Sequence, residues 1–242
     1  MKNLQADNIS HSPEQPVRQD AYRPTVEAGR EGTFAGKAGK AENSSNKFPA
    51  ITTVIIAGGL GTRMGGSKGL QLLHGRTLID WVLDAVGAYS AEILINTNEK
   101  PEAYARLDCR VIADQTPGWV GPLAGLQTAL RCAKHDSVLT VPCDTPYLPD
   151  DLIPRLVAAL DQCDCEAAVA VADGHRQPTI ALYRKNVGAK LDSYLNADKR
   201  KVNGWLDTLQ LAEVIFDHQA AFANINSEQE LAQANQRFNR GG

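Results

Sequence analysis

Residues 51–69 read ITTVIIAGGLGTRMGGSKG, a β-branched and largely apolar run that leads straight into a glycine-rich loop with two cations. The run over 51–57 predicts a strand buried on both faces, ending at Gly58. In the loop, glycines let backbone N–H groups approach an anion, and Arg63 and Lys68 supply charge for phosphate oxygens. The pattern predicts a phosphate-binding loop. A glycine-rich turn without a ligand is the alternative, which the two cations disfavour.

This loop differs from two common phosphate-binding patterns. It is not a Walker A loop, because Gly66 is followed by Ser67 and Lys68 rather than by Lys and then Ser or Thr. It is not the dinucleotide fingerprint either, since Met64 stands where the third glycine belongs. The loop therefore matches neither of these two nucleotide-binding patterns.

Beyond the loop, strand and helix patterns alternate along the chain. Expected strands cover 51–57, 92–96, 110–113, 137–141, 167–171 and 179–183, with a short last strand over 214–216. Expected helices cover 77–87, 101–107, 122–133, 151–160 and 187–195, and a capping box over 227–230 opens a C-terminal helix. Repeated βα units predict an α/β fold, a three-layer sandwich with a mostly parallel central sheet.

Three polar residues follow strands of this expected sheet, where ligands of parallel sheets bind. They are Asn96, Asp114 and Asp144. Asp144 lies in VPCDTPYLP, a proline-stiffened segment, and a rigid carboxylate opposite a phosphate loop suits Mg²⁺ that also binds phosphates. The alternative, that Asp144 caps the next helix, is weaker because Asp150 and Asp151 are better placed.

Composition excludes several classes of protein. The 242 residues include 25 Lys and Arg and 28 Asp and Glu, a net charge of −3, which offers no footprint for nucleic acid or an anionic membrane. No apolar run approaches the roughly 20 residues that span a bilayer. The five cysteines form no CxxC pair and no zinc spacing, so we expect reduced thiols in a cytoplasmic protein.

The first 48 residues differ in composition from the rest. They are rich in Gln, Ser, Asn, Pro and Gly and poor in large apolar side chains, which predicts a disordered N-terminal extension over 1–48. An uncharacterised docking role is the less favoured alternative. The folded domain is expected over 49–238, followed by a tail over 239–242.

The loop and several later segments carry a family resemblance. IIAGGLGTRMGGSKG resembles the signature of the GT-A-like nucleotidyltransferases, which have a Rossmann-like fold. VPCDTPYLP, QPTIALY, DKRKV and FANINSEQEL are similar, in that order, to the molybdenum cofactor guanylyltransferases, and the resemblance covers 51–236. It implies transfer of GMP from GTP to the terminal phosphate of molybdenum-molybdopterin, with Mg²⁺, giving the guanine dinucleotide cofactor and pyrophosphate.

The resemblance also implies roles for particular residues. It implies GTP contacts at Ile56, Ala57, Gly58, Gly59, Lys68, Asn96, Asp114 and Asp144. Asp144 would also hold Mg²⁺, and Asn224 and Asn226 would face the pterin acceptor. For the mechanism, we expect Arg63 and Lys68 of the loop to stabilise the departing pyrophosphate. Ser67 departs from the pattern, because many relatives carry Asp before the lysine, and this leaves the role of Ser67 open.

Several alternatives remain at this point. A cytidylyltransferase acting on the same pterin, or a sugar-1-phosphate nucleotidyltransferase, would share the fold and loop. A non-catalytic nucleotide-binding relative is disfavoured by the joint presence of Arg63, Lys68 and Asp144. By the same resemblance we expect a monomer whose partners are proteins of the molybdenum cofactor pathway and apo-molybdoenzymes.

Overall fold

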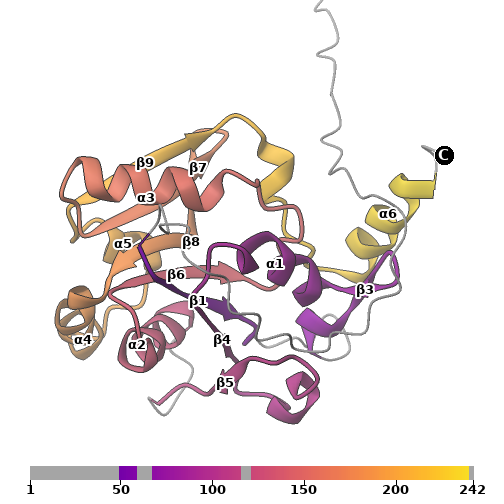
Figure 1. The fold of residues 1–242 in the computed structure, drawn as a ribbon, viewed down its shortest axis with the longest axis horizontal. Helices are drawn as coiled ribbons and strands as arrows, with labels where there is room; N and C mark the ends of the chain where they lie inside the picture. Colours follow the sequence, from indigo (N-terminus) through magenta and orange to yellow (C-terminus); the bar gives the residue numbers. More distant parts are fainter. Residues whose placement is uncertain (1–48, 59–66, 116–120, 240–242) are drawn as a thin grey trace, which may run out of the picture. The chain divides into compact units, whose positions relative to one another are not determined.

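Strand β1 lies inside a mixed sheet that organises the whole domain (Figure 1). The computed structural model describes residues 49–58, 67–115 and 121–239. In these ranges, seven strands pair in the order β5-β4-β1-β6-β8-β7-β9. They are β1 (Ile51–Ile56), β4 (Glu92–Asn96), β5 (Arg110–Ile112), β6 (Ser137–Pro142), β7 (Ala167–Ala172), β8 (His175–Arg184) and β9 (Leu211–Phe216). Strand β8 runs antiparallel to its neighbours β6 and β7, and the other pairs are parallel.

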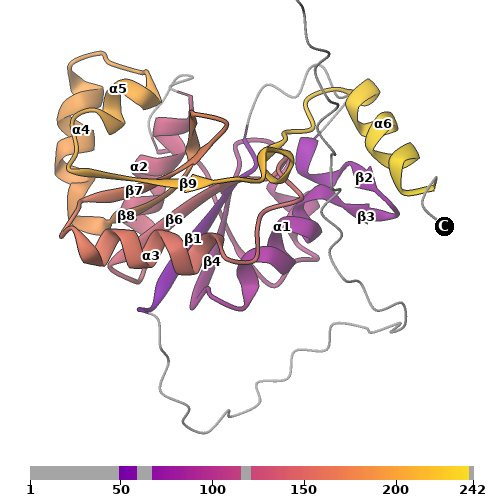
Figure 2. The same cartoon turned by 90° about the horizontal axis from the view of Figure 1, so that it is seen from above.

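Helices cover both faces of the sheet, as Figure 2 shows from above. The helices are α1 (Leu78–Gly87), α2 (Pro122–Cys132), α3 (Leu152–Gln162), α4 (Gly188–Asn196), α5 (Val202–Leu206) and α6 (Glu228–Asn239). Helices α1 and α3 share one apolar cluster with Ile55, while α2, α4 and α5 share another with Val54. Neighbouring side chains of β1 thus enter opposite cores, which confirms the expected three-layer α/β sandwich.

Local elements differ from the expectations in three places. The expected helix over 101–107 is wrong: the structure has a single 3₁₀ turn, Pro101–Tyr104. A hairpin of β2 (Leu72–Leu73) and β3 (Arg76–Thr77) was not predicted, nor was the short helix α5. The hairpin turn places His74 and Gly75 at positive φ, of 52° and 79°, as a tight two-residue turn requires.

The cysteines also differ from expectation. The prediction that all five thiols are reduced is wrong for Cys163 and Cys165, which the structure joins by a disulfide. The physical reason is local: Asp164 between them has a φ of 50°, and this turn brings their Cα atoms to 5.1 Å. Cys109, Cys132 and Cys143 are free.

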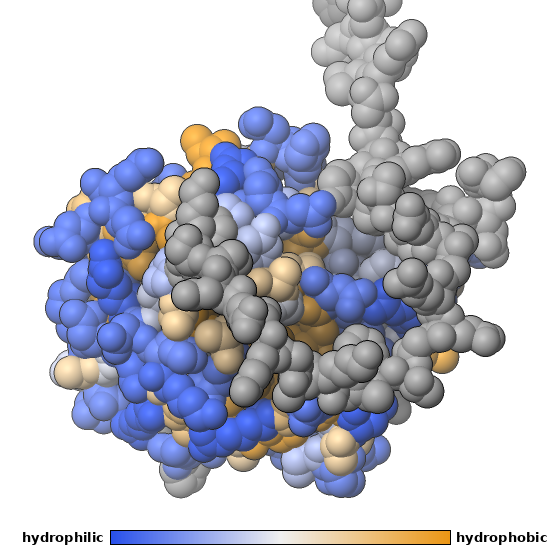
Figure 3. All heavy atoms as spheres, in the orientation of Figure 1, coloured by the Kyte–Doolittle hydropathy of each residue, from blue (hydrophilic) through white to orange (hydrophobic). Residues whose placement is uncertain are grey.

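Parts of the domain prediction lie outside the described residues, namely the extension over 1–48 and residues 240–242. Helix α6 continues to Asn239, one residue past the expected end of the domain. Polar and charged residues dominate the visible face in Figure 3. In the described ranges, no helix is both long and apolar enough to cross a membrane.

Leu139 offers a test of the packed core. It is fully buried in β6, in the cluster shared with α1 and α3. We expect Leu139→Ala to lower the free energy of unfolding by about 2–5 kcal/mol, because it leaves a cavity between tightly packed layers. Chemical denaturation measures this loss. Ile215→Ala in β9 is the control: Ile215 is 64% exposed, so its loss should stay below about 1 kcal/mol.

Candidate functional site

The strand register aligns the polar residues that follow β1, β4 and β6. Ile56 pairs with Asn96 on one side and with Pro142 on the other. Two further backbone hydrogen bonds extend these ladders, from Ala57 N–H to Asn96 O at 2.8 Å and from Cys143 N–H to Ile56 O at 3.1 Å. The end of β1 is thereby clamped between the segments that carry Asn96 and Asp144.

Asn96, Asn98 and Asp114 form a polar network at the ends of β4 and β5. The amide nitrogens of Asn96 and Asn98 donate to the two carboxylate oxygens of Asp114, at 2.9 and 2.8 Å. The backbone N–H of Asp114 donates to Asn98 Oδ1 at 2.8 Å. Asn96 is buried. The network brings two of the sequence-predicted residues, Asn96 and Asp114, together and adds Asn98, which stands two residues after Asn96 in the sequence.

Helix α2 leaves no space between itself and Asn96. A Cβ atom at Gly125 would lie 2.5 Å from Asn96 Oδ1, closer than any real contact allows. The absence of a side chain at Gly125 therefore permits the orientation in which Asn96 reaches Asp114.

A second cluster joins Lys68, Asp144 and Asn226. Lys68 Nζ makes an ion pair with Asp144 Oδ2 and donates to Asn226 Oδ1 at 2.7 Å. Asp144 is buried, and its other oxygen, Oδ1, has no hydrogen-bond partner among the described residues. Because a buried carboxylate oxygen without a partner is costly, Oδ1 is a suitable ligand atom for a cation.

Residues next to Asp144 hold the C-terminal segment in place. The Asp144 carbonyl accepts the N–H of Ile225 at 2.9 Å. The Thr145 hydroxyl donates to Asn224 Oδ1 at 2.7 Å. The two asparagines predicted from FANINSEQEL therefore lie beside Asp144 and Thr145, and Thr145 is a contact that sequence reasoning missed although it stands in VPCDTPYLP.

Close packing behind Lys68 fixes the position of its backbone. A Cβ atom at Gly69 would lie 3.3 Å from both Cys143 Cβ and the Tyr104 hydroxyl oxygen. Burial, with the nearby Asp144 charge as a smaller cause, raises the pKa of Cys143 to about 12, so the thiol stays protonated at neutral pH. Cys143 is thus a packing residue beside Gly69 rather than a nucleophile.

The remaining predicted residues either lie at the end of β1 or fall outside the described residues. Ile56, Ala57 and Gly58 lie at the end of β1 beside the Asn96 network. Gly59 and Arg63 lie outside the described residues. The Ser67 hydroxyl is buried without a partner among the described residues. No group of three or more His, Cys, Asp or Glu that could hold a metal occurs in the described ranges.

Comparison with known proteins assigns this chain to a family. The model of the MobA-like NTP transferase domain matches residues 53–214. The molybdenum cofactor guanylyltransferase of Burkholderia ambifaria is 45% identical over 199 residues, covering 78% of this chain and 97% of that protein. The enzyme of the same name from Shewanella frigidimarina is 39% identical over 187 residues, covering 76% of this chain and 95% of that protein.

Solved structures agree on the fold. Molybdopterin-guanine dinucleotide biosynthesis protein A from Archaeoglobus fulgidus superposes with a TM-score of 0.66 at 24% identity, covering 78% of this chain and 99% of that one. A 2-C-methyl-D-erythritol 4-phosphate cytidylyltransferase from Thermus thermophilus reaches 0.59 at 19% identity, covering 77% and 98%. Since proteins named for different substrates superpose this similarly, the fold alone does not identify the nucleotide.

Gly125→Ala tests the Asn96 network. The added methyl group must displace the Asn96 amide from Asp114, and we expect nucleotide affinity to fall about 5- to 30-fold, as for the loss of one or two hydrogen bonds. Titration calorimetry measures the affinity. Gly188→Ala at the start of α4 is the matched control, because its nearest neighbour is 3.9 Å away and no loss is expected. Equal affinities for both variants and the unaltered chain would refute the role of Gly125.

Proposed function

The chain belongs to the molybdenum cofactor guanylyltransferases, within the MobA-like NTP transferases, and we propose that it transfers GMP from GTP to the terminal phosphate of molybdenum-molybdopterin. An oxygen of that phosphate forms a bond to the α-phosphorus of GTP. The bond from the α-phosphorus to the bridging oxygen breaks, and its electron pair leaves with pyrophosphate. Catalysis is then positioning and charge neutralisation, with no covalent enzyme intermediate.

The observation that carries this proposal is the meeting of Lys68, Asp144 and Asn226 from three distant segments. A cation, a carboxylate with one unpartnered oxygen and an amide are suited to polyphosphate chemistry. The near full-length match to the guanylyltransferase relatives supports the choice of substrate.

The nucleotide side of the site is formed by β1, β4 and the start of the loop. We assign GTP contacts to Ile56, Ala57, Gly58 and Gly59, with Arg63 and Lys68 against the phosphates. Asn96 and Asp114 would hold the nucleoside, since their network presents polar atoms at the strand ends where nucleotides bind in parallel sheets.

Mg²⁺ fits the Asp144 position. The buried Oδ1 atom lacks a partner among the described residues, and Mg²⁺ binds one or two carboxylates together with substrate phosphates and water. When bound, the ion would neutralise developing charge on the phosphates. Lys68, which pairs with Asp144 in this structure, can then turn to the β- and γ-phosphates and stabilise the departing pyrophosphate.

The acceptor side is assigned to the C-terminal segment. Asn224 and Asn226 lie beside Thr145 and Lys68, with Asn226 exposed, and present amides close to the phosphate-binding cation. We further propose a cytoplasmic monomer that passes its product to apo-molybdoenzymes, directly or through other proteins of the pathway. Cytidylyl or sugar-1-phosphate transfer is the second candidate, which the similar superposition of the Thermus thermophilus cytidylyltransferase keeps open.

Nucleotide choice is the first test of the proposed function. With Mg²⁺ present, we expect calorimetry to give tighter binding of GTP than of CTP, ATP or UTP, because the relatives are guanylyltransferases. Release of pyrophosphate on addition of molybdenum-molybdopterin should then be seen with GTP. A preference for CTP would move the enzyme to a sister activity and overturn the guanylyl assignment.

Asp144→Asn tests the metal assignment. The amide has the size of the carboxylate but is a poor ligand for Mg²⁺, so we expect turnover to fall at least about 100-fold. The comparison is with Asp151→Asn at the N-cap of α3, whose carboxylate makes an exposed ion pair with Arg155 and to which no role in the reaction is assigned. Normal Mg²⁺-dependent turnover in a folded Asp144→Asn chain would rule out Asp144 as the metal ligand.

Lys68→Ala tests the role of the loop cation. Loss of a preorganised charge at the leaving group should lower kcat about 100- to 1,000-fold. Single-turnover kinetics at saturating GTP separate this step from binding. If only KM changes, Lys68 contributes to ground-state binding and not to stabilisation of the departing pyrophosphate.

A further inference from the structure

The C-terminal segment links the site to the β2–β3 hairpin. After β9 the chain passes Asp144 and Thr145 through residues 224–226 and then enters α6, which lies beside the hairpin in both ribbon views (Figures 1 and 2). The hairpin itself begins four residues after Lys68. Two separate paths therefore join Lys68 to α6, one through the hairpin and one through Asn226.

The N-terminus of α6 is linked to the site by hydrogen bonds through Asn226. Asn226 accepts the Lys68 ammonium, and its own N–H donates to Glu230 Oε2 at 2.5 Å. Glu230 also accepts from Ser227 N–H at 3.2 Å, while Ser227 Oγ accepts from Glu230 N–H at 3.1 Å. This capping box, predicted from the sequence, makes Asn226 a direct extension of the first turn of α6.

The second half of α6 is hydrogen-bonded to the hairpin through the side chain of Asn235. Asn235 Oδ1 accepts the backbone N–H of His74 at 2.7 Å, and Asn235 Nδ2 donates to Leu72 O at 3.3 Å. None of the α6 side chains that the structure describes, 228–236, is buried. Leu231 and Ala234 of α6 are partly buried and pack against a small apolar cluster of Leu73, Leu78 and Ile225. The Asn235 amide adds the two polar contacts that fix where α6 sits along the hairpin.

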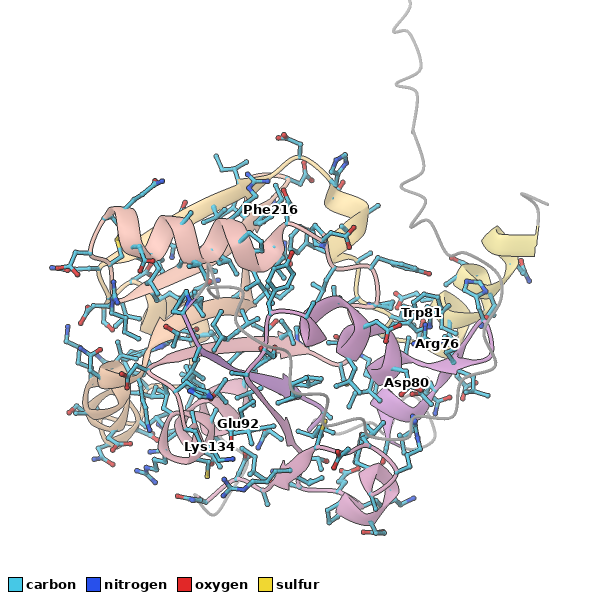
Figure 4. All side chains as sticks on the ribbon, viewed as in Figure 1. Arg76, Asp80, Trp81, Glu92, Lys134 and Phe216 are labelled. Carbon is cyan, nitrogen blue, oxygen red and sulfur yellow. A yellow bond between two sulfur atoms is a disulfide. The ribbon has the colours of Figure 1, made fainter. Side chains whose placement is uncertain are left out.

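The hairpin is a firm support for this contact. The indole N–H of Trp81 donates to Leu73 O at 3.1 Å, and the Arg76 guanidinium lies 4.8 Å from the centre of the Trp81 ring. Figure 4 shows Arg76 and Trp81 together where the hairpin meets α1. Because α1 braces the hairpin, a helix fixed to the hairpin is held relative to Lys68.

We propose that Asn235 is a positioning residue that, by fixing α6 to the β2–β3 hairpin, keeps Asn226 on Lys68 and so shapes the acceptor side of the site. Asn235 is seven residues beyond Glu228, the first residue of α6, a rise of about 10.5 Å at 1.5 Å per residue, and no contact with a reacting group is assigned to it. The assignment of this side to the acceptor rests on the proposed function. The mechanical link rests only on the contacts of this chain.

The test compares Asn235→Ala with Gln236→Ala, a matched change at an exposed neighbour on the same helix. Hydrogen exchange followed by NMR reports the link without substrate. In Asn235→Ala we expect faster exchange at His74 N–H and at Ile225 N–H, which donates to Asp144 O in the site, by about 5- to 30-fold, as for the loss of two hydrogen bonds. Gln236→Ala should change neither amide.

Kinetics then separate positioning from general damage. We expect Asn235→Ala to raise KM for molybdenum-molybdopterin about 5- to 30-fold while GTP affinity stays within about twofold. The proposal is overturned if Ile225 N–H keeps its protection, or if GTP affinity falls as much as acceptor affinity. If the unaltered chain transfers no GMP, the proposed function fails, and the exchange at Ile225 N–H alone decides the link between Asn235 and the site.

Discussion

Strand β1 is hydrogen-bonded on both sides, by β4 and by β6, and this double pairing determines where the polar residues at the strand ends gather. Because the three strands are parallel and in register at Ile56, their carboxyl ends stop at one edge of the sheet. Asn96 is the last residue of β4, and the segments after β6 and β1 carry Asp144 and the start of the glycine-rich loop. A change of one residue in this register would point every side chain of β1 to the opposite core.

At that edge the main electrostatic requirement is to compensate the negative charge of the buried Asp144 carboxylate. A buried carboxylate is costly unless it is paired, and Lys68 supplies the pairing in this structure. The same arrangement leaves one carboxylate oxygen unpartnered among the described residues. A polyphosphate with its cation can therefore replace one set of charge contacts by another, without leaving a bare charge in the interior.

Much of the fold could be predicted from the sequence, because strands buried on both faces have a strong apolar signal. The same runs predicted Asn96, Asp114 and Asp144 as strand-end residues. The β2–β3 hairpin was missed since its strands have two residues each, and its turn places His74, a residue without a strong turn signal, at positive φ beside Gly75. Helix α5 was missed because five residues containing Gly204 show no helical pattern. The contact of Lys68 with Asn226 could not be predicted from a sequence pattern. The two residues are 158 positions apart, and their contact depends on how the segment before α6 packs against the rest of the domain.

That separation in sequence has a consequence for biosynthesis. Chains are synthesised at about 5–20 residues per second, so roughly 8–32 s pass between the appearance of Lys68 and that of Asn226 on the ribosome. During this interval β1, β4, β5 and β6 can already pair, since their residues come first, while the segment with the two asparagines does not yet exist. The half of the site next to the glycine-rich loop is thus complete well before the half built from the C-terminal segment, and the nascent chain passes through a stage in which only the first half has formed.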